Sequence, residues 1–577
     1  MKTIQTHAPQ PGCGNLLRLS LAVAALGIVP GKSPATDAPP PERHSDVVVV
    51  GATPGGVAAA VAAARGGASV ILLEELGHVG GIVSGGLTNA DIRKKAAVGG
   101  LFAEFARRVR DHYAKTYGAD SAQVKVCQGG HMVEPKIAER IYREMLSGEK
   151  GIRLIERHRV VAARVAGTDG IERDATSGKR IDGAPPKDFG PTTRLVGIVT
   201  EDLTRPGSRV EFRAKAFIDA TYEGDLAALA GVPYRVGRES RATFGEPHAG
   251  KIYVRFGDRH PLPGSTGEAD DGIQAFCFRF HMTKDQANSV PVEKPPGYNR
   301  DDYRHLLADI TAGKVTQLRH AIQLYPMPNG NFEANSDHPH PDTGVPSESL
   351  DLAEENWGWP EAGPEERASI FERYWNHNEG LIWFLQHDEA VPAGLREEAL
   401  LWGFPKNEFA DNRHRPHHIY VRQGRRIWGE YTFTERDTDP EHATGLPRRK
   451  PDGIAVAEYA IDCHGVTKYD PAHPGVREGY FYIDFQPTQL PYRILVPKCV
   501  EGLLVPVACS ASHVGYQPIR MEPVFMALGE AAGIAAKIAQ NAGVKVRAVN
   551  VPDVQREILR RGGVVLYECQ PMRPEGL

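Results

Sequence analysis

Residue types that could do chemistry gather near the C-terminal end, in the segment SASHVGYQPIR (residues 510–520). His513 carries an imidazole, which is suited to proton transfer near neutral pH. Arg520 could bind an oxygen atom of a substrate or of a cofactor. A structural histidine and an arginine in a loop salt bridge are the alternative interpretations. We take His513 and Arg520 as candidate catalytic residues for a reaction that moves a proton.

A second polar group occurs in the central part of the chain. Arg422, Arg425 and Arg426 form a basic cluster in YVRQGRRIW. One of them could point into an active site, and Arg422 is our third catalytic candidate, although a solvated or domain-interface position is the alternative. His414, His417 and His418 crowd together just before this cluster. No acid lies at a convincing ligand spacing from these histidines, so we expect no metal site.

The elements that must position these residues begin with the stretch Ser45–Gly86. Val47–Val50 predicts a buried parallel strand, and glycines then break it. Ala58–Ala64 predicts a tightly packed helix, and Val70–Leu73 predicts a second strand that ends in the acid Glu74. The order strand, glycine turn, helix, strand and acid is typical of a dinucleotide-binding βαβ unit. A purely structural βαβ turn is the alternative.

Each position of this unit has a predicted task. Gly51 would make the tight turn, and Gly56 would let the helix approach the sheet. The N-terminus of the helix would face a pyrophosphate. Thr53 replaces the usual middle glycine; its side chain narrows the approach, although its hydroxyl could donate to a phosphate. Glu74 could bind both ribose hydroxyls and would repel a 2′-phosphate, which argues against NADP. NAD and FAD both remain open at this point.

Later segments favour FAD. A second glycine cluster, HVGGIVSGG (residues 78–86), implies that the backbone passes close to something flat or bulky, as in FAD enzymes; a flexible loop is the alternative. An apolar strand runs into Asp219, followed by Tyr222 and Glu223 where a glycine and a small residue are more usual. Pro523–Ala542 predicts a helix whose N-terminal dipole could stabilise the negative charge of a reduced flavin.

These blocks, together with YVRQGRRIWGEYTFTERD (residues 420–437), resemble the FAD-dependent oxidoreductases of the glutathione-reductase-like superfamily. The nearest resemblance is to a bacterial branch loosely associated with polysaccharide breakdown. The resemblance spans most of the chain after the leader, and it is specific for family and cofactor rather than for substrate. It implies noncovalently bound FAD, a two-lobed fold and redox chemistry on the flavin face. Thr53, Tyr222 and Glu223 depart from the family pattern.

The resemblance also implies a set of cofactor contacts, to which we add Thr53. The expected contacts are Gly51, Gly55 and Gly56 at the pyrophosphate, Glu74 at the adenosine ribose, Gly80, Gly81 and Ser84 along the ribityl side, the backbone of Val160 at the adenine, Asp219 at the strand end beside the nucleotide, and Ser512, Gly529 and Gly533 near the flavin.

Length and composition set the organisation. At 577 residues the chain is too long for one core, and a net charge of −4 without a basic stripe argues against nucleic acid as a partner. None of its 7 cysteines forms a CxxC pair. We predict an α/β fold, with a Rossmann-like FAD-binding domain and an inserted α+β substrate domain. The predicted boundaries are 1–43 for a leader and linker, 44–235 and 490–545 for the FAD-binding domain, 236–489 for the substrate (cap) domain and 546–577 for a C-terminal tail.

The N-terminus has the order of a secretory signal peptide. Lys2 and Arg18 precede the apolar run Leu19–Val29, and a proline-rich stretch follows. We therefore expect a periplasmic or secreted protein, without a twin-arginine motif and without a stable membrane span after the signal is removed. A disordered leader on a cytoplasmic enzyme is the alternative.

The predicted function is that of an FAD-dependent oxidoreductase. It would transfer a hydride between flavin and a small organic substrate, for which a sugar-derived or hydroxylated molecule is suggested only by family association. The other expected partner is an unidentified electron acceptor. One alternative is a flavin monooxygenase, but no second GxGxxG is present for NAD(P)H. Another alternative is a flavin-binding or electron-carrier protein without turnover.

Overall fold

The computed structural model describes residues 41–335 and 349–570. Within these residues the largest sheet has nine strands. In spatial order these are β3 (Ile152–Ile155), β2 (Val70–Leu73), β1 (Glu42–Val50), β7 (Arg209–Asp219), β6 (Thr193–Asp202), β4 (His158–Ala166) and β5 (Glu172–Asp174), with β19 (Val500–Glu501) beside β6 and β20 (Leu503–Leu504) beside β7. The β3-β2-β1-β7 part is parallel, whereas β7, β6, β4 and β5 pair antiparallel. The predicted α/β class is confirmed.

Strand β1 is covered on both faces, which explains its unbroken run of valines. Val47 and Val49 belong to a core shared with helices α1 (Pro54–Arg65) and α12 (Glu522–Ala542). Val48 and Val50 belong to a second core, shared with β4, β6 and the short helix α6 (Asp225–Leu229). A strand buried on both faces reads as a continuous apolar segment rather than an alternating one.

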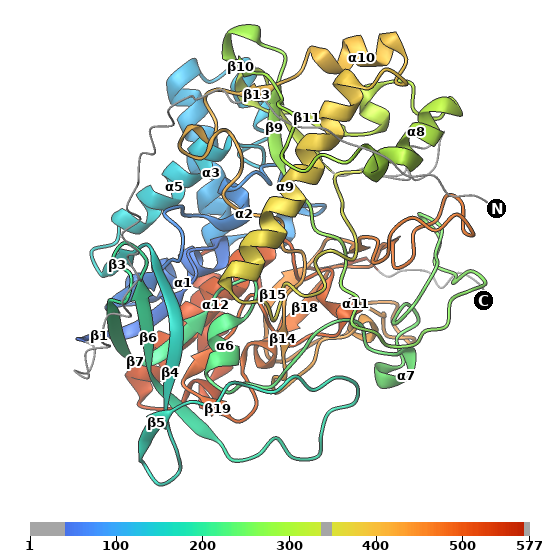
Figure 1. Cartoon of the computed structure of the whole chain (residues 1–577). Coiled ribbons are helices and arrows are strands. Elements are labelled where there is room, and N and C mark those ends of the chain that lie inside the picture. The colour runs from blue at the N-terminus through green and yellow to red at the C-terminus, as the bar shows by residue number, and fades with distance from the viewer. Residues whose placement is uncertain (1–40, 336–348, 571–577) are drawn as a thin grey trace, which may run out of the picture. The chain divides into compact units, whose positions relative to one another are not determined.

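The closing helix of the chain packs against its first helix. In Figure 1, α12 (red) lies beside α1 (blue) next to the parallel strands, so the two predicted parts of the FAD-binding domain meet in space. Phe105 and Tyr142 stack with ring centroids 4.4 Å apart where two further helices meet. The other helices of this side are α2 (Gly81–Ser84), α3 (Gly100–Tyr117), α4 (Ala122–Val126), α5 (Pro135–Ser147) and α13 (Val551–Arg560).

The inserted region is built around a small antiparallel sheet and one long helix. Strands β11 (Gln323–Pro326), β12 (Asn331–Asn335) and β9 (Phe280–Thr283) pair in that order. The helix α9 (Pro364–His387) places Trp375 edge-on to Phe278, with ring centroids 5.3 Å apart. The remaining helices and strands are β8 (Tyr234–Arg235), α7 (Arg241–Phe244), β10 (Ser289–Val290), α8 (Arg304–Thr311), α10 (Ala393–Leu400), β13 (Phe404–Pro405), β14 (Arg426–Ile427), β15 (Gly453–Ala457), β16 (Ile461–Cys463), β17 (Phe481–Ile483), β18 (Thr488–Pro491) and α11 (His513–Tyr516).

Hydrogen bonds cross both expected borders of the insertion. Strand β8, on the first side of the border at residue 235, pairs with β14 of the insertion. Strand β18 runs across the border at residue 489 and pairs with β15. Strand pairing thus connects the insertion at both ends to the part of the chain that carries the large sheet. The domain boundaries stay predictions.

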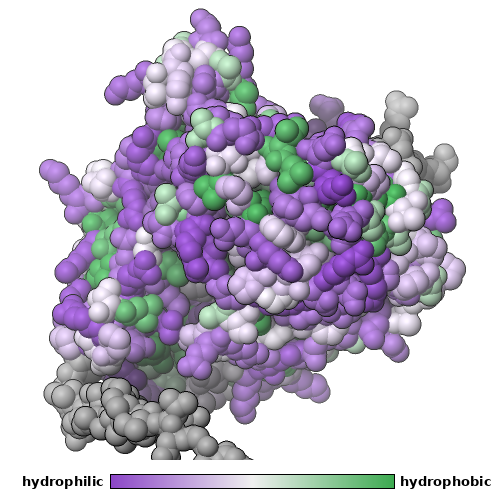
Figure 2. All heavy atoms as spheres, turned by 45° about the horizontal axis from the view of Figure 1, so that its top comes forward, coloured by the Kyte–Doolittle hydropathy of each residue, from purple (hydrophilic) through white to green (hydrophobic). Residues whose placement is uncertain are grey.

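Several expectations concern the ends and the surface of the chain. Most of the predicted leader lies outside the described residues. No helix in the described part of the chain combines the length and apolar character that crossing a bilayer requires. The six cysteines of that part are all free thiols. The face in Figure 2 is mostly hydrophilic, with apolar side chains in small separate groups, as is normal for protein surfaces.

Candidate active site

The turn between β1 and α1 has the tight geometry predicted for it. Gly51 donates its backbone N–H to the carbonyl of Leu73 at 2.8 Å and adopts φ +91°. A Cβ at this position would lie 3.0 Å from backbone atoms of Ala220 and Thr221. The turn therefore requires glycine for its conformation and for the close approach of the end of β7.

Thr53 is used differently from the expectation. It is the N-cap of α1: its Oγ1 accepts the N–H of Gly56 at 3.2 Å and donates to the carbonyl of Ala220 at 2.8 Å. The hydroxyl proton thus bonds the carbonyl after the end of β7 and is not free to donate to a phosphate, so the expected phosphate contact of the Thr53 hydroxyl is wrong. The cap leaves the positive end of α1 in place for an anion.

Glu74 lies where the motif predicts a ribose ligand, at the end of β2 beside the glycine turn. Its carboxylate accepts the N–H groups of Ala52 at 2.7 Å and of Leu76 at 2.8 Å. Burial raises the pKa of Glu74 to about 7. The N–H of His158 donates to the Glu74 carbonyl at 2.9 Å, which brings β4 and its residue Val160 to the same edge of the sheet.

The second glycine cluster lies directly against the first. Gly80 donates its N–H to the carbonyl of Ala52 at 2.8 Å. A Cβ on Gly81 would lie 3.2 Å from the Cα of Thr53 and 2.5 Å from the hydroxyl of Tyr222. Ser84 is fully buried, and its hydroxyl donates to the carbonyl of Val79 at 2.6 Å. The Ser84 side chain thus bonds its own segment, and its expected place along the ribityl side stays a prediction.

Asp219 lies at the strand end, as predicted, but its carboxylate faces its own loop. One oxygen accepts from the N–H of Thr221 at 3.0 Å and from its hydroxyl at 2.7 Å. The other accepts the N–H of Ala227 in α6 at 2.7 Å. Burial raises the pKa of Asp219 to about 6. These bonds shape the turn that carries Tyr222.

Tyr222 and Glu522 form a hydrogen-bonded pair that the sequence did not predict, and this pair joins three of the predicted cofactor segments. The hydroxyl of Tyr222 donates to Oε1 of Glu522 at 2.8 Å and accepts the N–H of Ile82 at 3.1 Å. The pair therefore links the glycine cluster, the turn after β7 and the start of α12. The signal was present, because Tyr222 departs from the family pattern and Glu522 opens the closing helix.

The glycines of α12 are explained by helix packing. A Cβ on Gly529 would lie 2.0 Å from the carbonyl oxygen of Gly55, and one on Gly533 would lie 2.2 Å from that of Ala59. Gly55 itself packs under the backbone of Phe525. Gly529 and Gly533 are thus the points where α12 crosses α1, and their expected place near the flavin stays a prediction.

His513 and Ser512 lie in a buried polar setting. Ser512 caps α11, accepting the N–H of Gly515 at 2.9 Å, and donates to Glu246. The Nε2 of His513 lies 3.4 Å from Sγ of Cys463. The His513 side chain is 1% exposed, and burial holds its pKa well below the usual range. The contacts of His513 favour the alternative of a structural, neutral histidine.

Arg520 stands at the centre of a buried network just before α12. Its guanidinium donates to the hydroxyl of Tyr420 at 2.9 Å and to the carbonyl of Asp462 at 2.6 Å, and it pairs with the Asp462 carboxylate at 3.2 Å. Gln517 accepts from Nε of Arg520 at 3.0 Å. Burial raises the pKa of Tyr420 to about 12, so this phenol keeps its proton at neutral pH.

The three arginines of the basic cluster separate in space. Arg422 pairs with Asp351 at 2.9 Å, whereas Arg425 and Arg426 pair with two other carboxylates. Only Arg422 approaches the Arg520 network, because its guanidinium carbon lies 4.7 Å from the ring centroid of Tyr420. The structure thus brings Arg422 and Arg520 to the same tyrosine, while Gln517 links the backbone carbonyl of His513 to Arg520.

A second group of residues that the sequence did not predict holds the chain in place just after the second glycine cluster. Glu333 of β12 accepts the N–H groups of Thr88 at 2.9 Å and of Asn89 at 2.7 Å, and it also pairs with Arg279. His281 bonds the Thr88 hydroxyl at 2.8 Å, and burial lowers the pKa of His281 to about 3. Arg279 and His281, the polar residues within the apolar alternation of FCFRFHM, were the sequence signal for this group.

No group of three or more His, Cys, Asp or Glu side chains within residues 41–335 and 349–570 is arranged to hold a metal ion. The histidines 417 and 418 instead lie near His78, and His417 stacks on it with ring centroids 4.4 Å apart.

These features fit a dinucleotide cofactor. A glycine turn with φ +91°, the capped start of α1 and the Glu74 carboxylate form one edge of the sheet, and the buried Oε2 of Glu522 has no partner among the described residues. The fold and this edge define a dinucleotide-binding α/β enzyme. The model of the family of FAD-dependent oxidoreductases matches residues 46–558, and the chain belongs to that family. The protein is therefore an FAD-dependent oxidoreductase with FAD as its cofactor.

Solved structures similar to this chain include two dehydrogenases and an FAD-dependent halogenase. L-proline dehydrogenase from P. horikoshii is 13% identical over 32% of this chain and 24% of its own (TM-score 0.16). The 3-ketosteroid-Δ4-(5α)-dehydrogenase from Rhodococcus jostii RHA1 is 17% identical over 33% and 50% (TM-score 0.18). The myxobacterial halogenase CndH is 14% identical over 51% and 52% (TM-score 0.21). The chain thus spans less than two thirds of each of these proteins. Comparison with curated proteins gives no match.

Proposed function

We propose that this FAD-dependent oxidoreductase transfers a hydride between the flavin and a small hydroxylated organic molecule. The observation that carries the proposal is the buried network of Arg520, Tyr420 and Asp462 directly before α12. It offers fixed hydrogen-bond donors in a water-poor setting, which is what orienting a substrate oxygen requires. The association with sugar-derived substrates remains only a family-level suggestion.

The proposed cofactor contacts follow the edge of the sheet. The start of α1 and the backbone of Gly80 and Gly81 would hold the phosphates and the ribityl chain, and Glu74 would hold the ribose. Bound FAD would supply the group that accepts or gives the hydride. The inserted region, residues 236–489, would cover the substrate.

The protein groups in this proposal have defined tasks. Tyr420 accepts a hydrogen bond from Arg520, so its own proton remains to be donated to a substrate oxygen. Arg520 keeps its geometry through Asp462 and Gln517. Arg422 positions the Tyr420 ring, since its guanidinium carbon lies 4.7 Å from the ring centroid and its charge is paired with Asp351.

The proposal is tested by anaerobic reduction of the bound flavin. Purified protein should show flavin absorbance bands that bleach when it is mixed with a member of a panel of alcohols, hydroxy acids and sugars. Bleaching only by NAD(P)H, followed by oxygen consumption, would indicate the monooxygenase alternative. A flavin that no panel member reduces, and that NAD(P)H leaves oxidised, would indicate a carrier without turnover and contradict the proposal.

We also propose export of the protein, on the evidence of Lys2, Arg18 and the apolar run Leu19–Val29. Expression with a C-terminal tag should yield periplasmic protein whose first residue lies beyond Val29. Full-length protein confined to the cytoplasm would refute this proposal.

A further inference from the structure

Glu522 is a buried acid at the meeting point of the predicted cofactor segments. It is the first residue of α12 and is 5% exposed. Oε1 accepts the Tyr222 hydroxyl at 2.8 Å, and that hydroxyl would lie 2.5 Å from a Cβ on Gly81. Gly81 in turn packs on Thr53 at the start of α1. The carboxyl group is thus contiguous with the glycine turn on which FAD binding depends.

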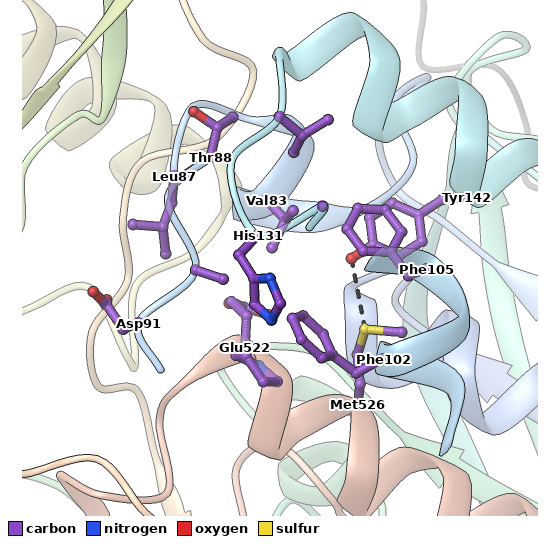
Figure 3. Close-up of a pocket in the computed structure, with 14 residues that line it drawn as sticks. Val83, Leu87, Thr88, Asp91, Phe102, Phe105, His131, Tyr142, Glu522 and Met526 are labelled. Carbon is purple, nitrogen blue, oxygen red and sulfur yellow. Dashed lines mark hydrogen bonds between the residues drawn. The ribbon is translucent and has the colours of Figure 1, made fainter. Parts of the chain in front are cut away.

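The other carboxyl oxygen has an unmet hydrogen-bonding need. Oε2 of Glu522 is buried and has no partner among the described residues. Buried polar atoms are almost always paired with protein, water or a ligand. The residue borders a cavity of about 20 Å³, which holds roughly one water. Figure 3 shows Glu522 and Met526 on one side of this cavity, with His131 reaching in from another.

The charge state of Glu522 follows from its surroundings. The groups that face it are Tyr222 from the turn after β7, Tyr142 from α5, Tyr516 from α11, and His131 and Asp91 across the cavity. Burial raises the pKa of Glu522 to about 8, and the hydrogen bond from Tyr222 only partly offsets this rise. At neutral pH the acid is therefore protonated and, because Oε1 accepts from Tyr222, Oε2 carries the hydrogen.

We infer that Glu522 is a cofactor-binding residue that contacts FAD as a neutral acid, donating its Oε2 hydrogen to the cofactor while Tyr222 holds Oε1. A neutral donor suits this place, because a carboxylate would repel a cofactor that carries a pyrophosphate. The inference depends on FAD binding, which family membership establishes, and not on the proposed hydride transfer.

Protonation and FAD binding must then be coupled. If only the protonated form of Glu522 donates to FAD, the affinity for FAD falls by about tenfold per pH unit above the pKa of Glu522 in the FAD-free protein. This affinity can be measured on the holoenzyme by serial dilution at pH 6.5 to 9.5, because released FAD fluoresces. We expect a break near pH 8 in the wild type.

Two variants separate this role from a structural one. Glu522→Gln keeps a neutral donor that cannot ionise, so the break near pH 8 in its affinity for FAD should disappear. Tyr222→Phe removes the hydrogen bond that lowers the pKa of Glu522, so its break should move to higher pH. If Glu522 and Tyr222 contributed only to the structure, each substitution would weaken FAD binding equally at every pH. The break would then stay at the wild-type pH.

The matched control is Glu530→Gln, two turns further along the same helix. Glu530 is also a buried carboxyl, but it accepts the N–H of Leu101 at 2.9 Å, away from the glycine turn. This variant should keep the wild-type profile. A wild type without a break, or a Glu522→Gln variant that retains it, would overturn the inference and assign Oε2 to a cavity water. Failure of every substrate to reduce the flavin would affect only the proposed function.

Discussion

Gly529 of α12 lies against the carbonyl oxygen of Gly55 in α1, so closely that a Cβ would be 2.0 Å from that oxygen. One turn further on, Gly533 repeats the contact with the carbonyl of Ala59. The closing helix of the chain is thereby pressed onto the helix that opens the FAD site. Correct placement of α1 therefore depends on two residues that the chain supplies almost at its end.

Gly529→Ala should destabilise the protein. The added methyl group meets backbone atoms that cannot rotate away, and overpacking of this kind costs about 1–3 kcal/mol. Chemical denaturation monitored by circular dichroism would measure the loss. Gly394→Ala is the control: Gly394 is an exposed residue of α10 with no neighbour within 4 Å of its would-be Cβ, and alanine there should leave the free energy of unfolding unchanged or slightly raised. Equal stability of the two variants would contradict the packing role.

Thr53→Ala should lower the stability of the protein by about 1 kcal/mol, because α1 loses its N-cap. The strand end at Ala220 also loses its hydrogen bond from Oγ1. Thr53→Ser keeps the hydroxyl and should remain close to the wild type in denaturation and in FAD affinity. If Thr53→Ser lost FAD while Thr53→Ala kept it, the hydroxyl would not be serving as a cap.

The contrast between Thr53 and Glu522 shows what the sequence could and could not predict. The βαβ unit and α12 follow from local periodicity and helix-start signals, and their predicted bounds lie within a few residues of the observed ones. The side-chain partners did not follow, because Thr53 bonds Ala220 and Tyr222 bonds Glu522 across large sequence separations. The role of a glycine is equally ambiguous in the sequence. Gly51 forms a turn, whereas Gly529 lets two helices cross, and only the tertiary structure distinguishes the two roles.

Asp351→Asn should destabilise the protein strongly, because it leaves the buried Arg422 guanidinium without its carboxylate. Breaking one side of a buried ion pair costs about 3–5 kcal/mol. The double variant Arg422→Met with Asp351→Asn should recover most of this loss. Flavin-reduction kinetics then check its function: a folded, FAD-loaded double variant that kept the wild-type rate would remove Arg422 from the catalytic candidates.

Tyr420→Phe should lower kcat/KM by about 10-fold to 100-fold, the value of one hydrogen bond to a group that gains charge in the reaction. FAD content should be unchanged, because Tyr420 is not among the proposed cofactor contacts. Tyr303→Phe removes a similarly buried hydroxyl, which donates to the His377 carbonyl at 3.0 Å, and it should leave kcat/KM unaltered. A rate for Tyr420→Phe equal to that of Tyr303→Phe would exclude Tyr420 from substrate binding.

Glu522→Gln should also change how stability depends on pH. In the folded protein the pKa of Glu522 is raised from the ordinary 4.5 to about 8. Between these pH values Glu522 is ionised in the unfolded chain but stays protonated in the folded protein. Rising pH therefore stabilises the unfolded state relative to the folded one, and the free energy of unfolding falls. The variant lacks this loss, so its advantage over the wild type should grow between pH 4.5 and 8 and then level off. Gly394→Ala, measured beside it, should shift stability equally at every pH. A constant difference between Glu522→Gln and the wild type would mean that Glu522 ionises normally in the folded protein.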